Sequence, residues 1–134
     1  MPTIKTNYQG QLRTQSKHLQ SGNTLITDAP TDNNGKGEAF SPTDMVAAAL
    51  SSCMMTIMGI IAERENIDMT GLKSDVTKMM ASDPRRIAEI KIDFSWPEAP
   101  ITEAQGTKLK RAALTCPVAL SLHPDLKQTI RFDF

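Results

Sequence analysis

The sequence predicts an α+β fold with antiparallel strand pairing, and three observations carry this prediction. Strand-like stretches cluster in residues 3–29, recur as a pair over residues 72–96 and end the chain at residues 128–134. A long uncharged run separates the first two groups, and a second helical pattern separates the last two. Strands and helices that are segregated in this way are typical of α+β chains, which favour antiparallel sheets.

The N-terminal region is expected to form three short strands, within residues 3–9, 11–17 and 23–29. Polar and apolar residues mix along these stretches, and "QSGN" is a turn signal between the second and the third. The segment "PTDNNGKGEAF" that follows is rich in Asn, Asp and Gly. It is a long loop for a compact domain, which indicates either a functional role or mobility.

The first helix is expected to begin at the motif "SPTD". Ser41 is a suitable N-cap, Pro42 suits the first helical position, and Asp44 stands where a capping-box acid belongs. The helix should end near Glu65, where charged residues return. Its core-facing stripe is expected at positions three and four apart, which are Val46, Ala49, Leu50, Cys53, Ile57 and Ile60.

The uncharged run Met45 to Ala62 raises the alternative of a membrane span, because it approaches the minimum length for one. Polar and small residues within it, such as Ser51, Ser52 and Gly59, make the run only modestly apolar. A helix buried on nearly all sides explains the run better. We therefore expect no membrane as a partner.

The second half of the chain is expected to form a hairpin, two helical segments and a closing strand. Residues 72–80 and 87–96 pair around the turn "ASDPRR", and one face of the second strand carries Ala88, Ile90, Ile92, Phe94 and Trp96. Thr102 and Gln105 predict a capping box at the start of the next helix. Pro117 must break that helix, so a new segment should start there with Cys116 at its N-cap.

Composition bounds the function. Acidic and basic residues number 15 each, which argues against nucleic acid or an anionic surface as the main partner. Two cysteines are too few for a secreted disulfide framework, and the N-terminus shows no signal-peptide core. We expect one domain over residues 1–134, a cytoplasmic location, and neither a metal nor another cofactor, since two Cys and two His are widely spread.

The two cysteines allow different interpretations. Cys53 falls on the core stripe, where a free cysteine most often serves as a small hydrophobe. Cys116 at a helix N-terminus should have a lowered pKa, because N–H groups and the helix dipole favour the thiolate. A packed thiol at a kink is the alternative for Cys116.

The motif "SPTDMVAAALSSC", with "CPVALSL" downstream, resembles the OsmC/Ohr superfamily along essentially the whole chain. This resemblance implies an intertwined homodimer with two central helices and outer sheets. It implies an antioxidant enzyme of the oxidative stress response, a peroxidase that reduces organic hydroperoxides and in some members hydrogen peroxide. Cys53 would be the peroxidatic thiol, Cys116 the resolving thiol, and a dithiol or lipoylated protein the reductant.

The resemblance also implies a cation beside the peroxidatic thiol, since an apolar setting raises a thiol pKa. In the relatives this cation is an early arginine that a glutamate at the helix start holds. Arg13 is the candidate here, with a solvated strand residue as the alternative, and His18 is its rival. The glutamate position is occupied by Thr43, and the neighbouring Asp44 is one residue away, about 100° around the helix.

Two other functions remain as alternatives. A non-catalytic small-molecule-binding or redox-sensing protein on the same fold would explain why Thr43 replaces the glutamate. A Cys/His acyl-transfer enzyme would need a histidine beside a cysteine, and His123, seven residues after Cys116, is the one spacing that suggests it.

Overall fold

The computed structural model describes residues 1–134, which divide into two compact units, Met1–Val46 and Ala47–Phe134. Each unit has its own three-stranded sheet. Helix α1 (Pro42–Arg64) begins in the N-terminal unit and continues through the C-terminal one. The α+β class is confirmed, whereas a single domain over residues 1–134 stays a prediction.

The N-terminal unit consists of β1 (Ile4–Gly10), β2 (Arg13–His18) and β3 (Thr24–Asp28), which pair antiparallel in chain order. All three predicted strands are confirmed. Two residues, Gln11 and Leu12, connect β1 to β2, and both have a positive φ, of 55° and 62°. Positive φ at both residues is typical of type I′ hairpin turns, whose backbone matches the twist of the strands. After β3 the predicted loop contains one short 3-10 turn, η1 (Thr31–Asn33).

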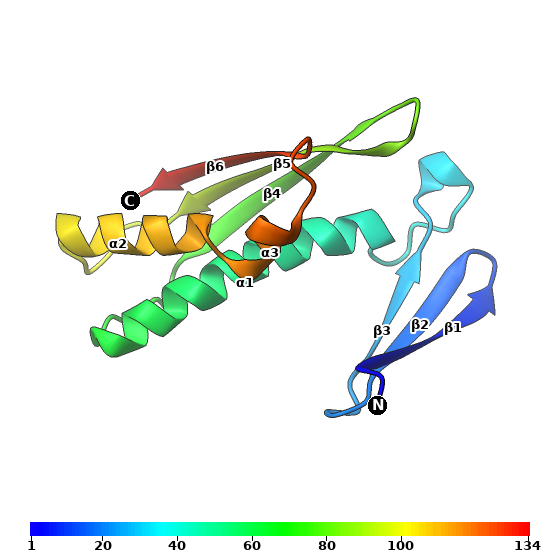
Figure 1. The fold of residues 1–134 in the computed structure, drawn as a ribbon, viewed down its shortest axis with the longest axis horizontal. Coiled ribbons are helices and arrows are strands. Elements are labelled where there is room, and N and C mark those ends of the chain that lie inside the picture. The colour runs from blue at the N-terminus through cyan, green and yellow to red at the C-terminus, as the bar shows by residue number, and fades with distance from the viewer. The chain divides into compact units, whose positions relative to one another are not determined.

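The C-terminal unit contains the sheet β4-β5-β6 and the helices α2 and α3 (Figure 1). Its elements after α1 are β4 (Lys73–Ala81), β5 (Arg86–Ser95), α2 (Glu103–Leu114), α3 (Pro117–Ser121) and β6 (Lys127–Asp133). Strands β4 and β5 form the predicted antiparallel hairpin.

The prediction of antiparallel pairing is wrong for the last strand, because β6 pairs parallel to β5. Between these strands the chain passes through α2 and α3, which return it to the end of the sheet where β5 began. Parallel neighbours need such a crossover, and the helical segment here is long enough to provide it. The sequence predicted the helices but not the edge of the sheet to which the chain returns.

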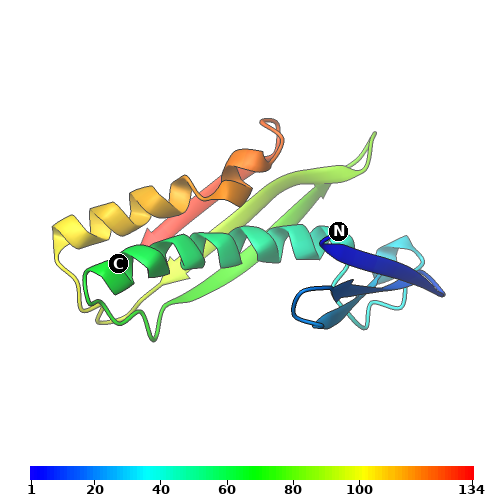
Figure 2. The same cartoon turned by 60° about the horizontal axis from the view of Figure 1, so that its bottom comes forward.

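The three helices lie on the same face of the β4-β5-β6 sheet (Figures 1 and 2). Ile90, Ile92 and Phe94 point from β5 into this layer and are almost completely buried, as the alternation predicted. Phe94 stacks on Phe132 of β6 with ring centroids 5.3 Å apart. Ser51 of α1 reaches the sheet as well, through a 2.7 Å hydroxyl contact with Ser74. The core of the unit therefore lies between β5 and the helices.

The start of α1 is capped as predicted. The backbone N–H of Asp44 donates to Ser41 Oγ at 3.1 Å, and that of Ser41 donates to Asp44 Oδ2 at 3.0 Å. The end of the helix, at Arg64, also agrees with the expected end near Glu65. Thr102 and Gln105 form the predicted capping box of α2, and α3 begins with Cys116 as N-cap and Pro117 in its first turn.

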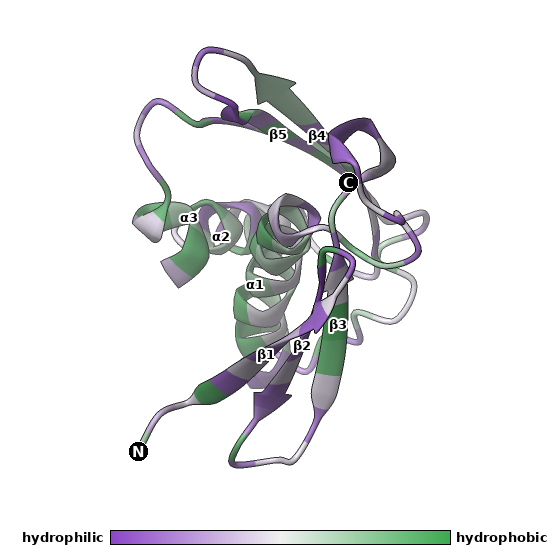
Figure 3. Ribbon diagram, turned by 90° about the vertical axis from the view of Figure 1, so that its right-hand side faces the viewer, coloured by the Kyte–Doolittle hydropathy of each residue, from purple (hydrophilic) through white to green (hydrophobic).

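The buried stripe of α1 differs from the predicted one. Its buried residues are Ala47, Leu50, Ser51, Met54, Met58 and Ala62. Of the predicted stripe only Leu50 is buried, whereas Cys53 is half-buried and Ile60 is 43% exposed. The helix is apolar along much of its length (Figure 3), so no polar face marks which side meets the sheet. Tertiary packing selects a stripe rotated by about one residue.

By length and composition alone α1 could also cross a membrane, and 33% of its apolar window is buried in the structure. The core helix of a soluble protein meets the same two criteria. The expectation that α1 is buried on nearly all sides is not met within a single chain. A substantial part of its apolar surface remains open.

Candidate active site

Cys53 and Cys116 meet in the C-terminal unit. Cys53 lies in the middle of α1 and is half-buried, whereas Cys116 caps α3 and is completely buried. Both are free thiols, and they are close enough for Cys53 to affect the pKa of Cys116. The chain therefore brings together two cysteines that are 63 residues apart in the sequence.

Burial raises the pKa of the Cys116 thiol, and the neighbouring Cys53 raises it further. The N–H groups of Ala119 and Val118 act in the opposite direction, and Ala119 N lies 3.4 Å from Cys116 Sγ. The expected fall of this pKa is therefore wrong. Cys116 does cap α3, but this helix has only five residues and the sulfur is shielded from water. Desolvation therefore raises the thiol pKa more than the N–H groups lower it.

The two thiols differ in their access to solvent. A solute can reach the half-buried Cys53, whereas Cys116 is shielded from solvent and its burial favours the thiol over the thiolate. A sulfenic acid on Cys53 would meet the Cys116 thiol at once, and such a pair condenses to a disulfide with loss of water. The geometry is suited to two-electron thiol oxidation that ends in a Cys53–Cys116 disulfide.

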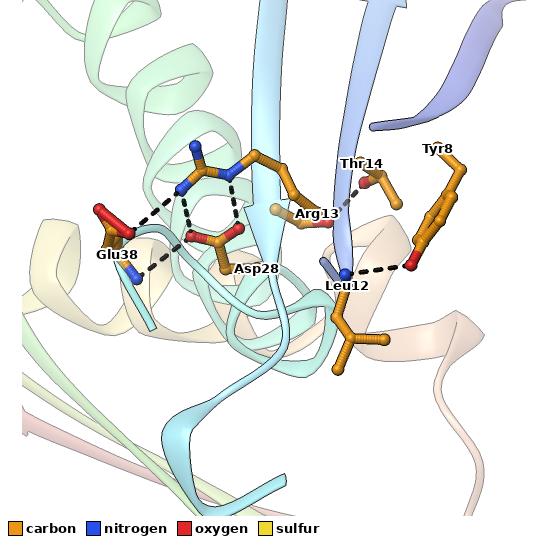
Figure 4. A network of polar contacts seen from close by, with 7 residues as sticks. Tyr8, Leu12, Arg13, Thr14, Asp28 and Glu38 are labelled. Carbon is orange, nitrogen blue, oxygen red and sulfur yellow. Dashed lines mark hydrogen bonds and ion pairs between the residues drawn. The ribbon is translucent and has the colours of Figure 1, made fainter. Parts of the chain in front are cut away.

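Arg13, the predicted cation, lies on β2 in the N-terminal unit and makes a two-point ion pair with Asp28 of β3 (Figure 4). Its Nε lies 2.7 Å from Asp28 Oδ1 and its Nη2 lies 2.8 Å from Oδ2. The guanidinium holds the pKa of Asp28 below its ordinary value, and the carboxylate raises the pKa of Arg13. Because the structure describes the two units separately, the role of Arg13 toward Cys53 stays a prediction.

The sequence interpretation missed Asp28. It is completely buried, and it faces Arg13 in the β2–β3 register. A signal was present, because Asp28 lies near the end of the third predicted strand and Arg13 lies near the start of the second. An antiparallel hairpin places those two ends side by side.

The remaining predicted residues of the N-terminal unit have local contacts. Asp44 caps α1, and the Thr43 hydroxyl lies 3.2 Å from that of Ser41. His18 is exposed, and its Nδ1 lies 2.6 Å from Ser21 Oγ in the turn after β2. The supporting roles of these three residues near a thiol stay predictions.

His123 follows α3 and is 72% exposed. Its Nδ1 accepts a hydrogen bond from the backbone N–H of Asp125 at 3.0 Å, which closes the turn before β6. This contact accounts for the histidine as a turn residue. It gives no support to an acyl-transfer pair with Cys116.

A cavity of about 530 Å³ lies at the opposite end of α2 from Cys116. Trp96, Phe134, Ile101 and Lys110 are among its lining residues, and neither cysteine is. The structure gathers no group of three or more His, Cys, Asp or Glu side chains that could hold a metal ion. The two thiols are thus the reactive groups that the fold brings together.

The sequence pattern of the family described as OsmC-like protein matches residues 35–131, which is most of the chain. This chain belongs to the OsmC-like family. The match begins in the loop after β3 and includes both cysteines and all elements through most of β6. The resemblance in the two cysteine motifs is therefore confirmed.

Solved structures agree with this membership. A protein of Psychrobacter arcticus 273-4, named provisionally as an osmotic stress induced and detoxification response protein, is 51% identical to this OsmC-like chain. The similarity covers 98% of this chain and 96% of that one, with a TM-score of 0.93.

More distant structures share the fold. The OsmC organic hydroperoxide resistance protein of Legionella pneumophila is 13% identical, with a TM-score of 0.75 over 100% of this chain and 98% of that one. An OsmC-like protein of Mycoplasma pneumoniae is 17% identical, with a TM-score of 0.77 over 96% of this chain and 93% of that one. None of the curated proteins compared matches the chain.

Proposed function

We propose that this OsmC-like protein is a thiol peroxidase that reduces organic hydroperoxides through a Cys53–Cys116 disulfide cycle. The observation that carries the proposal is the contact between a half-buried thiol on α1 and a buried thiol at the start of α3. Family membership and the names of the relatives support a role in the stress response.

The proposed cycle has three balanced steps. The Cys53 thiolate attacks the terminal oxygen of a hydroperoxide, the O–O bond breaks, and the alcohol leaves with a proton while Cys53 becomes a sulfenic acid. The Cys116 thiol then attacks this sulfur, and water leaves as the disulfide forms. A dithiol, or a lipoylated protein, reduces the disulfide and is itself oxidised to a disulfide.

The surroundings of Cys53 favour an apolar hydroperoxide. Val46, Ile57 and Ile61 on α1 are half-buried, and Ile60 is 43% exposed. A hydrocarbon substituent would lose its contact with water on such a surface, and this burial favours binding. Hydrogen peroxide would gain nothing from it, so we expect it to be the poorer substrate.

We also propose that Arg13 stabilises the Cys53 thiolate and that two chains form the working unit in the cytoplasm. The open apolar surface of α1 and the exposed Leu114 and Leu120 support a homodimer, because a second copy would cover them. Analytical ultracentrifugation at micromolar concentration should show a dimer. Ile60→Glu should weaken it, whereas Thr77→Glu on the opposite face of the β4-β5-β6 sheet should not.

The test of the peroxidase is intact-mass spectrometry of the reduced protein after one equivalent of cumene hydroperoxide. The wild type should lose the mass of two hydrogens within seconds. Cys116→Ser should instead gain one oxygen on Cys53, and Cys53→Ser should stay unchanged. If the wild-type mass does not change for minutes while both thiols remain titratable, the peroxidase proposal fails.

The second candidate is a redox-sensing or small-molecule-binding protein without turnover. Thr43 favours it, because the carboxylate expected at this position of the helix start is missing. Such a protein would form the disulfide once but would consume no further peroxide when dithiothreitol is present. Continued consumption with Cys53 intact excludes this candidate.

A further inference from the structure

We propose that the cavity formed by the first turns of α2 and the residues that follow β5 and β6 binds a small organic cation, a protonated amine with an apolar or aromatic body. Its volume of about 530 Å³ is within the range of sites that take small molecules. All of its lining residues belong to the C-terminal unit, and neither cysteine is among them. The proposal therefore goes beyond the peroxidase function and does not rest on it.

The wall of the cavity beside the sheet is aromatic and apolar. Trp96, which follows β5, is 3% exposed, and its ring lies edge to face with that of Phe134, with the centroids 5.5 Å apart. Ile101, in the loop before α2, adds an aliphatic side chain. Aromatic faces attract cations, and Lys110 Nζ already lies 5.2 Å from the Phe134 ring centroid. This wall is suited to the body of an aromatic or apolar amine.

The charged side chains of the cavity leave negative charge uncompensated. Glu98 precedes α2 and Glu103 is its first residue, and the carboxylate of neither makes an ion pair. Lys110, the single cation of the lining, lies two turns after Glu103, about 10 Å further along the helix axis. An amine beside the two carboxylates would therefore gain attraction from both and stay away from Lys110.

Gly106 keeps room in the cavity. It lies inside α2, where glycine is less stable than alanine because its backbone loses more conformational freedom on folding. Packing does not demand a glycine there, since a Cβ atom would lie 3.5 Å from Ile101 Cδ1, an ordinary contact distance. The glycine therefore weakens the helix without relieving a clash, and what it provides is space in the cavity that it lines.

Glu98 is the opposite case, a side chain where a glycine would be less strained. Its φ of 56° lies in the left-handed region, which is uncommon for residues other than glycine. The cavity thus has a glycine where alanine would be more stable and a glutamate where glycine would be. A void left by imperfect packing needs neither choice, whereas a site that takes an amine needs both the space and the carboxylate.

The fluorescence of Trp96 tests the proposal directly, because Trp96 is the only tryptophan of the chain and lines the cavity. The probes phenethylamine, phenethyl alcohol and hydrocinnamate share a phenethyl body and differ in the charge of the end group. The amine should change the emission saturably, with a Kd on the order of 1 mM. It should bind roughly tenfold more tightly than the alcohol, and hydrocinnamate should bind most weakly. Sodium chloride should weaken the binding of the amine but not that of the alcohol.

Variants of Gly106 locate the site. Gly106→Leu should abolish the fluorescence change, because the new side chain fills the cavity. Ala104→Leu, at an exposed position of the same helix that does not line the cavity, is the matched control and should bind as the wild type does. Gly106→Ala should bind the amine less tightly and yet unfold at a higher temperature, since alanine is the better helix former.

Variants of Glu98 test the charge. Glu98→Gln should lose roughly fivefold in affinity for the amine and none for the alcohol. Glu98→Gly should show the same loss and also unfold at a higher temperature, because glycine adopts a positive φ without strain. Gln11→Gly, at a φ of 55° between β1 and β2, is the matched control, and its affinity for the amine should be unchanged.

Three results would overturn the inference. They are the absence of a saturable change with phenethylamine, hydrocinnamate that binds as tightly as the amine, and full affinity for the amine in Gly106→Leu or Glu98→Gln. If Gly106→Leu does not fold, Gly106→Ala and Glu98→Gln provide the test. Cys53→Ser should bind the amine as the wild type does, so a failure of the peroxidase proposal leaves this inference unaffected.

Discussion

Cys53 and Cys116 are neighbours in the C-terminal unit, yet only Cys53 has exposed surface. The packing that places Cys116 beside Cys53 also buries its sulfur, and this burial raises the pKa of Cys116. One thiol of the pair can therefore meet a solute, while the other stays protonated beside it.

We expect Cys53 to react with iodoacetamide much faster than Cys116 in the folded protein. Cys116 is shielded and its thiolate is disfavoured, whereas Cys53 is half-buried. Alkylation of the two single variants, Cys53→Ser and Cys116→Ser, should be followed by mass spectrometry from pH 6 to 10. Equal rates at pH 8 would contradict the burial argument, and urea-unfolded samples provide the reference rate.

The raised pKa of Cys116 also predicts a loss of stability in alkali. A group whose pKa is higher in the folded state contributes fully below its unfolded pKa, and the contribution disappears as pH rises through the folded pKa. Urea unfolding of the reduced protein should therefore show a falling free energy above about pH 9. In Cys116→Ser the contribution of this thiol to the decrease in unfolding free energy should be missing. If the variant and the wild type show the same pH dependence, the raised pKa of Cys116 is contradicted.

The Arg13–Asp28 pair predicts the opposite dependence in acid. The pKa of Asp28 is lowered, chiefly by its hydrogen bonds with Arg13, so its contribution is present above the unfolded pKa. It is lost as pH falls through the folded pKa. Asp28→Asn should be less stable than the wild type at pH 7, and the difference should shrink below about pH 4. A difference that stays constant down to pH 2 would count against the ion pair.

The capping box of α2 predicts that replacing Thr102 lowers the free energy of unfolding, whereas replacing Thr107 on the same helix does not. Thr102 Oγ1 accepts the N–H of Gln105 at 3.1 Å, and Gln105 Oε1 accepts the N–H of Thr102 at 2.9 Å. Thr102→Ala should cost about 1 kcal/mol in urea unfolding. Thr107→Ala on the same helix removes no cap and should be neutral or slightly stabilising, because alanine is the better helix former. Equal losses would show that the box contributes nothing.

Two leucines of α2 test the position of the core. Leu109 is completely buried and Leu114 is 51% exposed. Leu109→Ala should destabilise the protein by about 2–5 kcal/mol, because it removes contacts and leaves a cavity. Leu114→Ala should cost much less in one isolated chain. A comparable cost for Leu114 that depends on protein concentration would show that a second chain covers it.

The local features of this protein follow from its sequence alone. The caps at Ser41, Thr102 and Cys116 were predictable, because a cap depends on residues within one turn of each other. The alternating face of β5 was predictable for the same reason, since a period of two is a property of the strand itself. The pair of cysteine motifs predicted the family, which the match over residues 35–131 confirmed.

Tertiary structure decided the remaining features, which depend on residues that are distant in the sequence. The parallel pairing of β6 with β5 depends on where the α2–α3 crossover lands, and the buried stripe of α1 depends on which side meets the sheet. Asp28 becomes the partner of Arg13 only through the register of β2 and β3. The pKa of Cys116 rises because packing removes water from a sulfur whose local sequence favours the thiolate. Desolvation depends on how distant segments pack around the sulfur, so it cannot be predicted from the residues next to Cys116.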